Sequence, residues 1–124
     1  MNTSNKSATD KIKKVPKPWG YEIWWAQTEK YVGKILHVNK GHSMSFQYHR
    51  EKDETLYVHS GNIVLEIENE DGVREKMNLG PGDAYRITPL TRHRITALED
   101  SDILEASTHE VDDIVRLEDN YGRV

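Results

Sequence analysis

Residues 41–61 read GHSMSFQYHREKDETLYVHSG, and within this stretch polar and apolar side chains alternate. From Ser43 to His49 a polar residue stands at every second position, with an apolar residue between. Because successive side chains of a β-strand point to opposite faces, Gln47 and His49 share one face of the predicted strand. Glu54 follows after a short turn and can reach the same side. The stretch therefore predicts a strand and a turn that bring three possible ligand side chains together.

Outward from this stretch, residues 19–108 read as short strands separated by turn residues. The predicted strands are Tyr31–Val38, Ser43–His49, Thr55–Ser60, Ile63–Ile67, Val73–Leu79, Ala84–Ile87, His93–Leu98 and Ile103–Thr108. Gly61-Asn62 and Asp71-Gly72 are typical two-residue hairpin turns, so the strands that flank each of them are expected to pair. No long stretch has helical periodicity, and one short helical turn is expected around Val111–Leu117. The chain is therefore predicted to be all-β, as a sandwich or a barrel.

The chain has 124 residues, the size of one domain, which excludes an enzyme with separate cofactor and substrate lobes. It has no cysteine, so disulfide scaffolds, thiolate zinc sites and cysteine nucleophiles are excluded. No run of about 18 apolar residues marks a membrane span, and the N-terminus lacks the apolar segment of a secretory signal. We therefore expect a soluble, cytoplasmic protein with no membrane partner.

The formal net charge of −4 is unevenly distributed along the chain. Residues 1–14 carry four Lys and one Asp, whereas residues 99–124 carry nine acidic residues and two Arg. No net basic face remains to displace counterions, so nucleic acid is not expected as a partner. The polar residues 1–15 are expected to form a disordered basic tail, and the folded domain is expected to occupy residues 16–124.

A longer spacing pattern extends beyond the 41–61 stretch. Counted from Gly41 the pattern is G-x5-Q-x-H-x4-E-x6-G, and Gly82, Pro89 and His93 follow it. It resembles the paired motifs of the cupin superfamily, with Gln47 in the position of the first His. The resemblance implies a single antiparallel jelly-roll barrel, the double-stranded β-helix, with the polar strand face turned inward. It also implies one divalent metal ion held by Gln47, His49, Glu54 and His93.

Two imidazole nitrogens and two oxygen donors suit zinc, which ranks first, and also manganese, iron, cobalt or nickel. The alternative is that His49 and His93 are ordinary structural or surface histidines. The other four histidines show no comparable pattern, and we expect them to be structural or exposed: His37, His42, His59 and His109.

Three further segments resemble one branch of this superfamily, the type II mannose-6-phosphate isomerase domain. They are Pro18-Trp19-Gly20, Ser45–His49 and the closing stretch Asp112–Arg123 (DDIVRLEDNYGR). Lys52 stands where that family has an Arg, and Thr55-Leu56 replaces a His-Trp pair. The resemblance implies a metal-dependent isomerase that converts mannose 6-phosphate to fructose 6-phosphate.

Such an isomerisation needs a Lewis acid, a base that moves a proton between C1 and C2, and cations that hold the phosphate. If the resemblance holds, the catalytic candidates are Glu54, Glu105 and Lys52. The candidates for binding the small-molecule sugar phosphate are Lys52, Arg92 and Arg94. Two alternatives stay open. One is a non-catalytic cupin that binds a sugar or nucleotide sugar, and the other is a cupin enzyme of another reaction class, such as an epimerase or a dioxygenase.

The apolar face of the strand at 43–49 presents Met44, Phe46 and Tyr48, and it would point away from the barrel if Gln47 points inward. Three large apolar side chains on one exposed face would form a sticky patch. Cover is therefore expected from the N-terminal strand or from a second subunit, and a homodimer is predicted.

The C-terminal strap, residues 109–124, is expected to dock on the barrel through Ile114, Val115 and Leu117. Disordered acidic segments are poor in such large apolar residues. The isomerase resemblance implies that this strap lies near the mouth of the site, where Arg116 or Arg123 can help to order the strap or the substrate.

Overall fold

The structure is a computed structural model that describes residues 12–124. These residues form eleven β-strands and contain no helix. The strands are β1 (Lys13–Lys17), β2 (Gly20–Gln27), β3 (Tyr31–Val38), β4 (Phe46–Tyr48), β5 (Glu54–Ser60), β6 (Ile63–Glu68), β7 (Arg74–Leu79), β8 (Ala84–Ile87), β9 (His93–Ala97), β10 (Ser101–Thr108) and β11 (Val115–Glu118).

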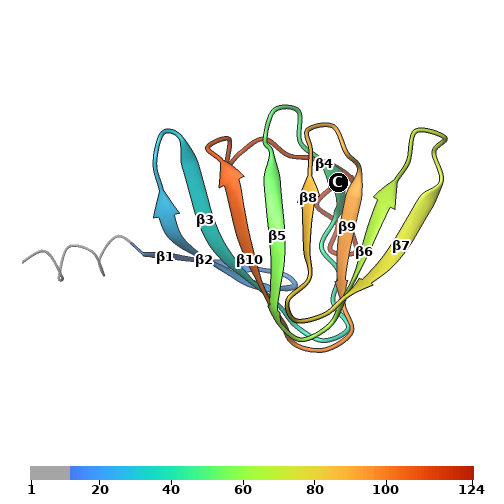
Figure 1. The fold of residues 1–124 in the computed structure, drawn as a ribbon, viewed down its shortest axis with the longest axis horizontal. Helices are drawn as coiled ribbons and strands as arrows, with labels where there is room; N and C mark the ends of the chain where they lie inside the picture. Colours follow the sequence, from blue (N-terminus) through green and yellow to red (C-terminus); the bar gives the residue numbers. More distant parts are fainter. Residues whose placement is uncertain (1–11) are drawn as a thin grey trace, which may run out of the picture.

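The strands form two antiparallel sheets that enclose one core. The six-stranded sheet has the order β1-β2-β3-β10-β5-β8, and the five-stranded sheet has the order β11-β4-β9-β6-β7. The strands converge at the lower end of the view in Figure 1 and spread apart at the upper end. The prediction of an all-β fold is confirmed, and the two antiparallel sheets are consistent with a jelly-roll barrel. Among residues 12–124 there is no helix that is long and apolar enough to cross a membrane.

One of the two predicted hairpins forms and the other does not. β6 and β7 pair across the Asp71-Gly72 turn. β5 and β6 belong to different sheets, so the hairpin predicted at Gly61-Asn62 is wrong, and the chain crosses there between the sheets. Gly61 has a φ of 89°, and a Cβ at this position would lie 2.2 Å from Ser101 Oγ. This crossing therefore requires glycine both for its backbone conformation and for the close approach of β10.

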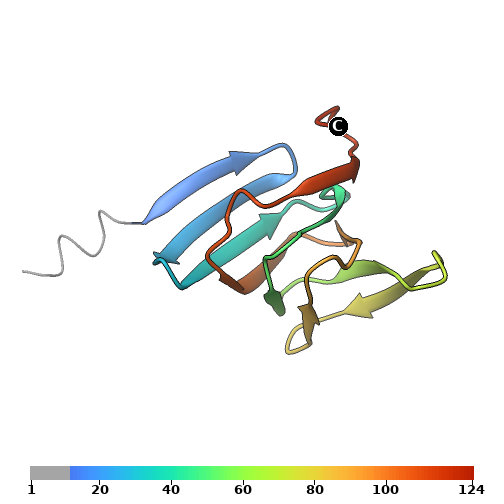
Figure 2. The same ribbon diagram turned by 90° about the horizontal axis from the view of Figure 1, so that it is seen from above.

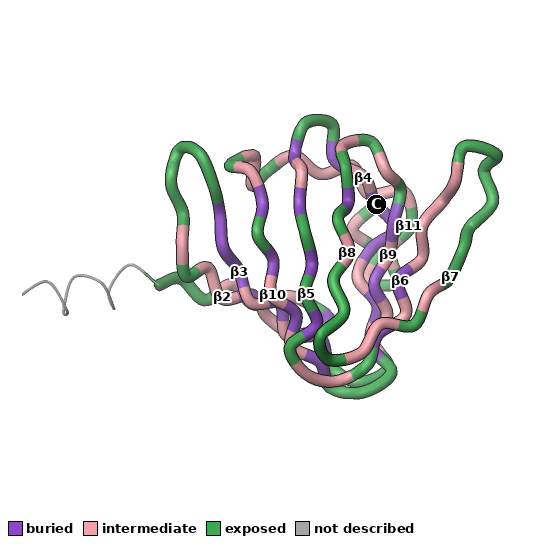
Figure 3. The backbone as a smooth tube through the Cα atoms, in the orientation of Figure 1, coloured by how far each residue is buried: buried purple, intermediate pink, exposed green. Residues whose placement is uncertain are grey.

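The inward-facing side chains change from apolar to ionisable along the strands. On β3 and β10, Leu36 pairs in register with Ile103 inside the core, and Lys34 pairs with Glu105 beyond it. On β9, His93 precedes the core residue Ile95. Buried segments (purple) are prominent where the strands converge in Figure 3. The core therefore fills one end of the barrel, and charged side chains line the other.

The N-terminal edge of the barrel begins earlier than the sequence predicts. Residues 13–15, which were assigned to the disordered tail, form the first part of β1, whereas residues 1–11 lie outside the described residues. β1 is an edge strand that pairs only with β2. An edge strand tolerates Pro16, whose missing N–H would interrupt the ladder of a central strand. β2 was not among the predicted strands, because an irregularity between Trp24 and Ala26 breaks its alternation.

The C-terminal segment docks on the barrel as a strand and not as a helix. The helical turn predicted around Val111–Leu117 is absent, and β11 pairs instead with β4, opposite β9. Val115 lies opposite Tyr48, and Arg116 lies opposite Gln47. The free edge of β4 offers backbone hydrogen bonds to this segment, whose β-branched residues favour a strand. These hydrogen bonds stabilise the strand more than the weak helical pattern stabilises a helix. Figure 2 shows this strand (red) between the β1–β2 hairpin (blue) and β4.

Asp113 fastens the start of this docked segment to the turn after β4. The backbone N–H groups of Arg50, Glu51 and Lys52 donate hydrogen bonds to its carboxylate at 2.9, 2.7 and 2.9 Å. Partial burial would raise the pKa of Asp113, but these hydrogen bonds lower it to about 2. The turn therefore forms a small anion-binding nest that the chain fills with its own carboxylate.

The outer face of β4 is covered from within the chain. Phe46 is only 1% exposed, and the guanidinium groups of Arg74 and Arg94 lie 3.8 and 5.6 Å from its ring centroid. Met44 turns toward the core cluster, and Tyr48 is half-buried. The expected cover over Phe46 is present, but it comes from arginine side chains and not from the N-terminal strand or a second subunit. A homodimer remains a prediction.

Removal of the strap is expected to destabilise the barrel. Truncation after Glu110 deletes β11 and the Asp113 contacts, and a loss of roughly 2–3 kcal/mol lowers the Tm of a small domain by about 10 °C or more. Thermal unfolding followed by circular dichroism measures this change. The control is truncation after Arg123, which removes only Val124, a residue that is 73% exposed. An unchanged Tm after the longer truncation would show that the strap is not docked in solution.

Asp113→Asn is expected to weaken the barrel in a pH-dependent way. The pKa of Asp113 falls from its ordinary 3.8 to about 2 on folding, so its ionised form stabilises the folded state. This stabilisation is complete above about pH 4 and is lost as the pH falls from about 4 toward 2. Urea unfolding at pH 7 should show a loss of about 1–3 kcal/mol that shrinks at acidic pH. The neighbouring Asp112→Asn is the control, since the exposed Asp112 carboxylate accepts no hydrogen bond among the described residues.

Candidate metal centre

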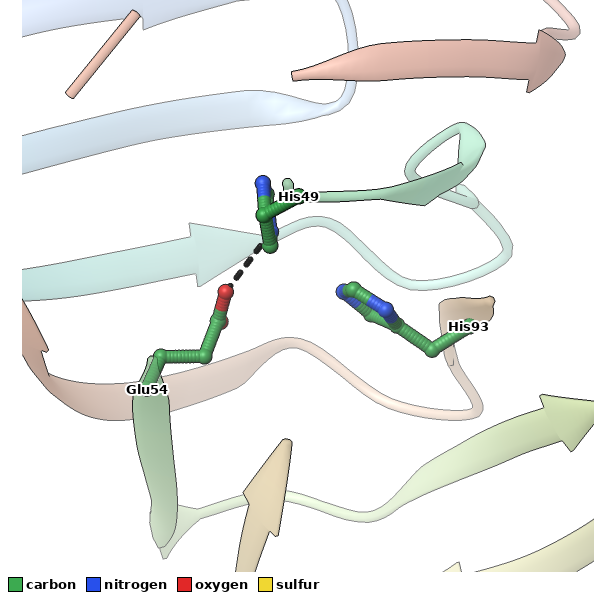
Figure 4. A group of neighbouring side chains, drawn as sticks. All are labelled: His49, Glu54 and His93. Carbon is green, nitrogen blue, oxygen red and sulfur yellow. Dashed lines mark ion pairs between the residues drawn. The ribbon is translucent and has the colours of Figure 1, made fainter. Parts of the chain in front are cut away.

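Three side chains from separate strands meet at the polar end of the barrel. His49 follows β4, Glu54 begins β5 and His93 begins β9. One ligand atom of each lies within 4.8 Å of the others, and Figure 4 shows the three side chains pointing toward one another. The residues are 3%, 5% and 3% exposed. The sequence expectation that His49 and His93 form a site with Glu54 is consistent with this cluster, and the alternative of surface histidines is wrong.

Backbone carbonyls fix the orientation of both imidazole rings. His49 Nδ1 lies 2.6 Å from the carbonyl oxygen of Asp113, and His93 Nδ1 lies 2.8 Å from that of Thr91. Since a carbonyl only accepts hydrogen bonds, each Nδ1 carries a proton, and in the neutral form of each ring Nε2 is the nitrogen with the free lone pair. Metal-binding histidines are usually held by such a contact at the other ring nitrogen.

The contact between His49 and Glu54 fits a metal ion better than a hydrogen bond. His49 Nε2 and Glu54 Oε2 lie 2.7 Å apart, but both atoms are buried and neither has a hydrogen-bond partner. Burial would raise the pKa of Glu54, but the adjacent His49 ring and the Lys52 ammonium outweigh it, so the pKa is lowered. Burial also lowers the pKa of His93. The charged carboxylate and the neutral imidazole are the forms that bind a divalent cation.

Gln47 lies beside these three residues but has a partner of its own. It is 7% exposed, lines the same cavity and pairs in register with His93. Its Oε1 accepts a hydrogen bond from Ser45 Oγ at 2.5 Å. A carbonyl oxygen has a second lone pair, so this bond is compatible with ligation. Its assignment as a fourth ligand stays a prediction.

A buried ion-pair network adjoins the three residues. Lys52 Nζ lies 3.0 Å from Glu105 Oε2 and 3.6 Å from Glu54 Oε2, and all three residues are buried. Burial would lower the pKa of Lys52, but Glu105 and Glu54 raise it above its ordinary value. Lys52 therefore links the carboxylate of Glu54 to that of Glu105, and both carboxylates favour its charged form.

The structure does not bring Arg92 and Arg94 to this site. Both lie next to His93, and because His93 points inward, its neighbours on the strand point outward. Arg92 Nη1 lies 3.6 Å from Glu68, and Arg94 Nε lies 3.4 Å from Glu66. The assignment of these arginines to substrate binding is therefore corrected, and Lys52 is the one of the three candidates that lines the cavity.

The four remaining histidines lie outside the cavity, as expected. His37 Nδ1 contacts Asp102 at 2.7 Å, and His42 Nδ1 contacts the Tyr121 hydroxyl at 2.7 Å. His59 and His109 are exposed.

The cavity around the site has a volume of about 470 Å³ and extends from the metal centre to β1 and β11. The sequence analysis missed several of its lining residues, including Lys17, Glu22, Trp24 and Lys34. Glu22 accepts a hydrogen bond from Trp24 Nε1 at 2.8 Å and lies 3.4 Å from Lys34 Nζ. Lys34 could have been predicted from the sequence, because it lies two residues before the buried Leu36 on the same strand and its side chain therefore points to the same face.

Comparisons with solved structures support this fold. KdgF from Halomonas sp. matches with a TM-score of 0.69 and 25% identity, over 83% of this chain and 93% of that one. Oxalate decarboxylase of Bacillus subtilis, a protein with Mn(II) centres, matches with a TM-score of 0.74 and 17% identity, over 93% of this chain and 33% of that one. CapF, a capsular polysaccharide assembling protein of Staphylococcus aureus, matches with a TM-score of 0.66 and 15% identity, over 90% of this chain and 32% of that one.

Sequence comparisons point the same way. An acireductone dioxygenase of Bacillus pumilus is 33% identical over 58 residues, which are 47% of this chain. The matched part is 33% of that relative's length. The family described as "Cupin domain" matches residues 34–106, more than half of the chain and the part that contains His49, Glu54 and His93. The chain therefore belongs to the cupin domain family.

Proposed function

We propose that this cupin is a metal-dependent enzyme that interconverts the aldose and ketose forms of a small sugar phosphate, with mannose 6-phosphate and fructose 6-phosphate as the first pair to test. The observation that carries this proposal is the buried Lys52–Glu105 pair, 3.0 Å apart and adjacent to the metal-binding Glu54. Proton transfer between two neighbouring carbons needs a general base beside the reacting atoms, and a buried carboxylate that an ion pair holds in place can serve as one.

Each group has a distinct role in this proposal. A divalent ion held by His49, Glu54 and His93, with Gln47 as a fourth ligand, would polarise the oxygens on C1 and C2. Glu105 accepts the proton from C2 of the aldose while the carbonyl oxygen O1 gains a proton, which gives an enediol. Glu105 then returns its proton to C1 while the hydroxyl on C2 gives up its proton and becomes the ketose carbonyl, so that the proton gained at O1 is balanced by the proton lost at O2. Lys52 holds Glu105 in place through their ion pair, and the two neighbouring carboxylates raise the pKa of Lys52. Glu54 is used as a ligand, so Glu105 is the better base of the two candidates.

The size and lining of the cavity support a small polar substrate. A volume of about 470 Å³ is within the range of roughly 300–1,000 Å³ that is typical of small-molecule sites. The Pro18-Trp19-Gly20 and Asp112–Arg123 segments resemble the type II mannose-6-phosphate isomerase domain, and residues of both segments line the cavity.

A second candidate function is oxygenation at an iron centre. Two histidines and one carboxylate are also the ligand set of non-haem Fe(II) oxygenases. The matched relative from Bacillus pumilus is named an acireductone dioxygenase. Iron in the purified protein together with oxygen uptake on an enediol substrate would favour this function over isomerisation.

Loss of any of the three ligands should abolish stoichiometric metal binding. We expect about one divalent ion per chain in the wild-type protein, and far less in His49→Ala, Glu54→Ala and His93→Ala, since each leaves the ion under-coordinated. Elemental analysis after dialysis measures the metal content. His59→Ala is the matched control, because His59 is exposed on β5 and lies outside the cavity. Full metal content in both His49→Ala and Glu54→Ala would refute the site.

Glu105→Gln and Lys52→Met should lower kcat for mannose 6-phosphate isomerisation by about 10²–10⁴-fold, the usual contribution of a positioned acid or base. Both variants should keep their metal ion, because neither residue belongs to the ligand triad. A coupled fructose 6-phosphate assay, run beside metal analysis, separates the two effects. Arg86→Gln, which changes a side chain that is 65% exposed, is the control. Metal-loaded wild-type protein without turnover would contradict the isomerase proposal.

A further inference from the structure

Two cationic side chains at the far end of the cavity have no carboxylate partner. Lys17 on β1 and Arg116 on β11 both line the cavity, from the edges of opposite sheets. Within residues 12–124 neither forms an ion pair or a side-chain hydrogen bond, and Arg116 Nε is buried without any partner. A buried guanidinium nitrogen that lacks an acceptor is costly, so a ligand that supplies one is favoured.

Two more cations contribute to the charge at this position. Burial lowers the pKa of Lys17, and the positive charges of Lys34, Arg116 and Arg123 lower it further, although Glu22 opposes them. Burial and the charge of Arg123 likewise lower the pKa of Arg116. All four cations line the same cavity, which is consistent with this mutual repulsion.

The carboxylates nearby are already engaged. Glu22 accepts a hydrogen bond from Trp24 Nε1 and forms an ion pair with Lys34 Nζ. Asp119 binds Arg123 through two nitrogens, at 2.8 Å each. Glu22 and Asp119 act on Lys17 and Arg116 only at a distance, so neither cation has a carboxylate partner of its own in the described part of the chain.

We infer that Lys17 and Arg116, flanked by Lys34 and Arg123, form a subsite for the phosphate group of the substrate. This inference rests on the proposed function and deepens it, because it says where the charged end of the sugar phosphate lies. A phosphate dianion matches two unpaired cations, whereas a neutral sugar would leave both without a partner. Arg116 offers a planar fork of donors, and Lys17 adds a mobile point charge.

The position of the subsite also orients the substrate. The same cavity is lined by Lys17 and Arg116 and by His49, Glu54 and His93. A phosphate held between β1 and β11 leaves the other end of the molecule free to reach the metal centre and Glu105. The subsite thus takes the place of Arg92 and Arg94, which lie outside the cavity.

Binding of inorganic phosphate tests the subsite apart from catalysis. Isothermal titration calorimetry in EDTA removes any phosphate binding to a metal ion. We expect Arg116→Gln and Lys17→Met each to raise the Kd for phosphate by about 10-fold or more, as expected when one hydrogen bond to a charged group is lost. Arg86→Gln and Lys30→Met, which remove the same charges outside the cavity, should leave the Kd unchanged.

The variants need a check on folding, because Arg116 lies in the docked strand. Arg116→Lys keeps the charge but not the fork, and it should weaken phosphate binding less than Arg116→Gln does. Thermal unfolding should give similar Tm values for both variants. Wild-type affinity for phosphate in Arg116→Gln and in Lys17→Met would overturn the subsite.

Three organic ligands distinguish the chemistry of the anion. Mannose 6-phosphate should bind far more tightly than mannose, and the difference should disappear in the Lys17→Met, Arg116→Gln double variant. If glucuronate binds as tightly as mannose 6-phosphate and is lost in the same variants, the site takes carboxylates and the phosphate assignment is wrong. If phosphate binds as expected but the wild-type protein has no isomerase activity, the subsite stands and the proposed function fails.

Discussion

The contact between Asp113 and the turn after β4 is the constraint on which the site depends. The carboxylate of Asp113 accepts hydrogen bonds from three consecutive backbone N–H groups. Its backbone carbonyl oxygen accepts a hydrogen bond from His49 Nδ1. The first interaction fixes the backbone between His49 and Lys52, and the second orients the His49 ring of the candidate metal centre. One residue of the C-terminal strap therefore positions both the His49 ring and the turn that carries Lys52.

The fold tolerates buried charges at the polar end of the barrel because most of them are arranged in pairs. Burying an isolated ion costs several kcal/mol, whereas paired and hydrogen-bonded ions are tolerated. Lys52, in the turn before β5, is paired with Glu105, and Lys34 is paired with Glu22. The apolar core at the other end supplies the stability that lets these charges remain inside.

The sequence predicts most of the barrel and the centre of the site, because strand alternation and turn residues are local signals. Tyr31–Val38 and Ala84–Ile87 form strands with the predicted bounds. Local signals fail where pairing is decided by distant partners. β11 forms a strand because β4 has a free edge, and Gly61 crosses between sheets because β10 lies against it. Neither partner can be identified from the residues nearby in the sequence.

The same distinction explains why the arginines beside His93 were wrongly assigned. Adjacency in a strand places two side chains on opposite faces, so a residue next to an inward ligand is directed away from the cavity. Arg116 is 23 residues from His93 in the sequence, yet it faces the cavity because β11 joins the sheet beside β4. Asp113 and Arg116 lie three residues apart on the strap. Asp113 contacts His49, and Arg116 lines the far end of the cavity with Lys17. Docking of this one segment therefore contributes to both ends of the cavity, because it orients the His49 ring at one end and places Arg116 at the other.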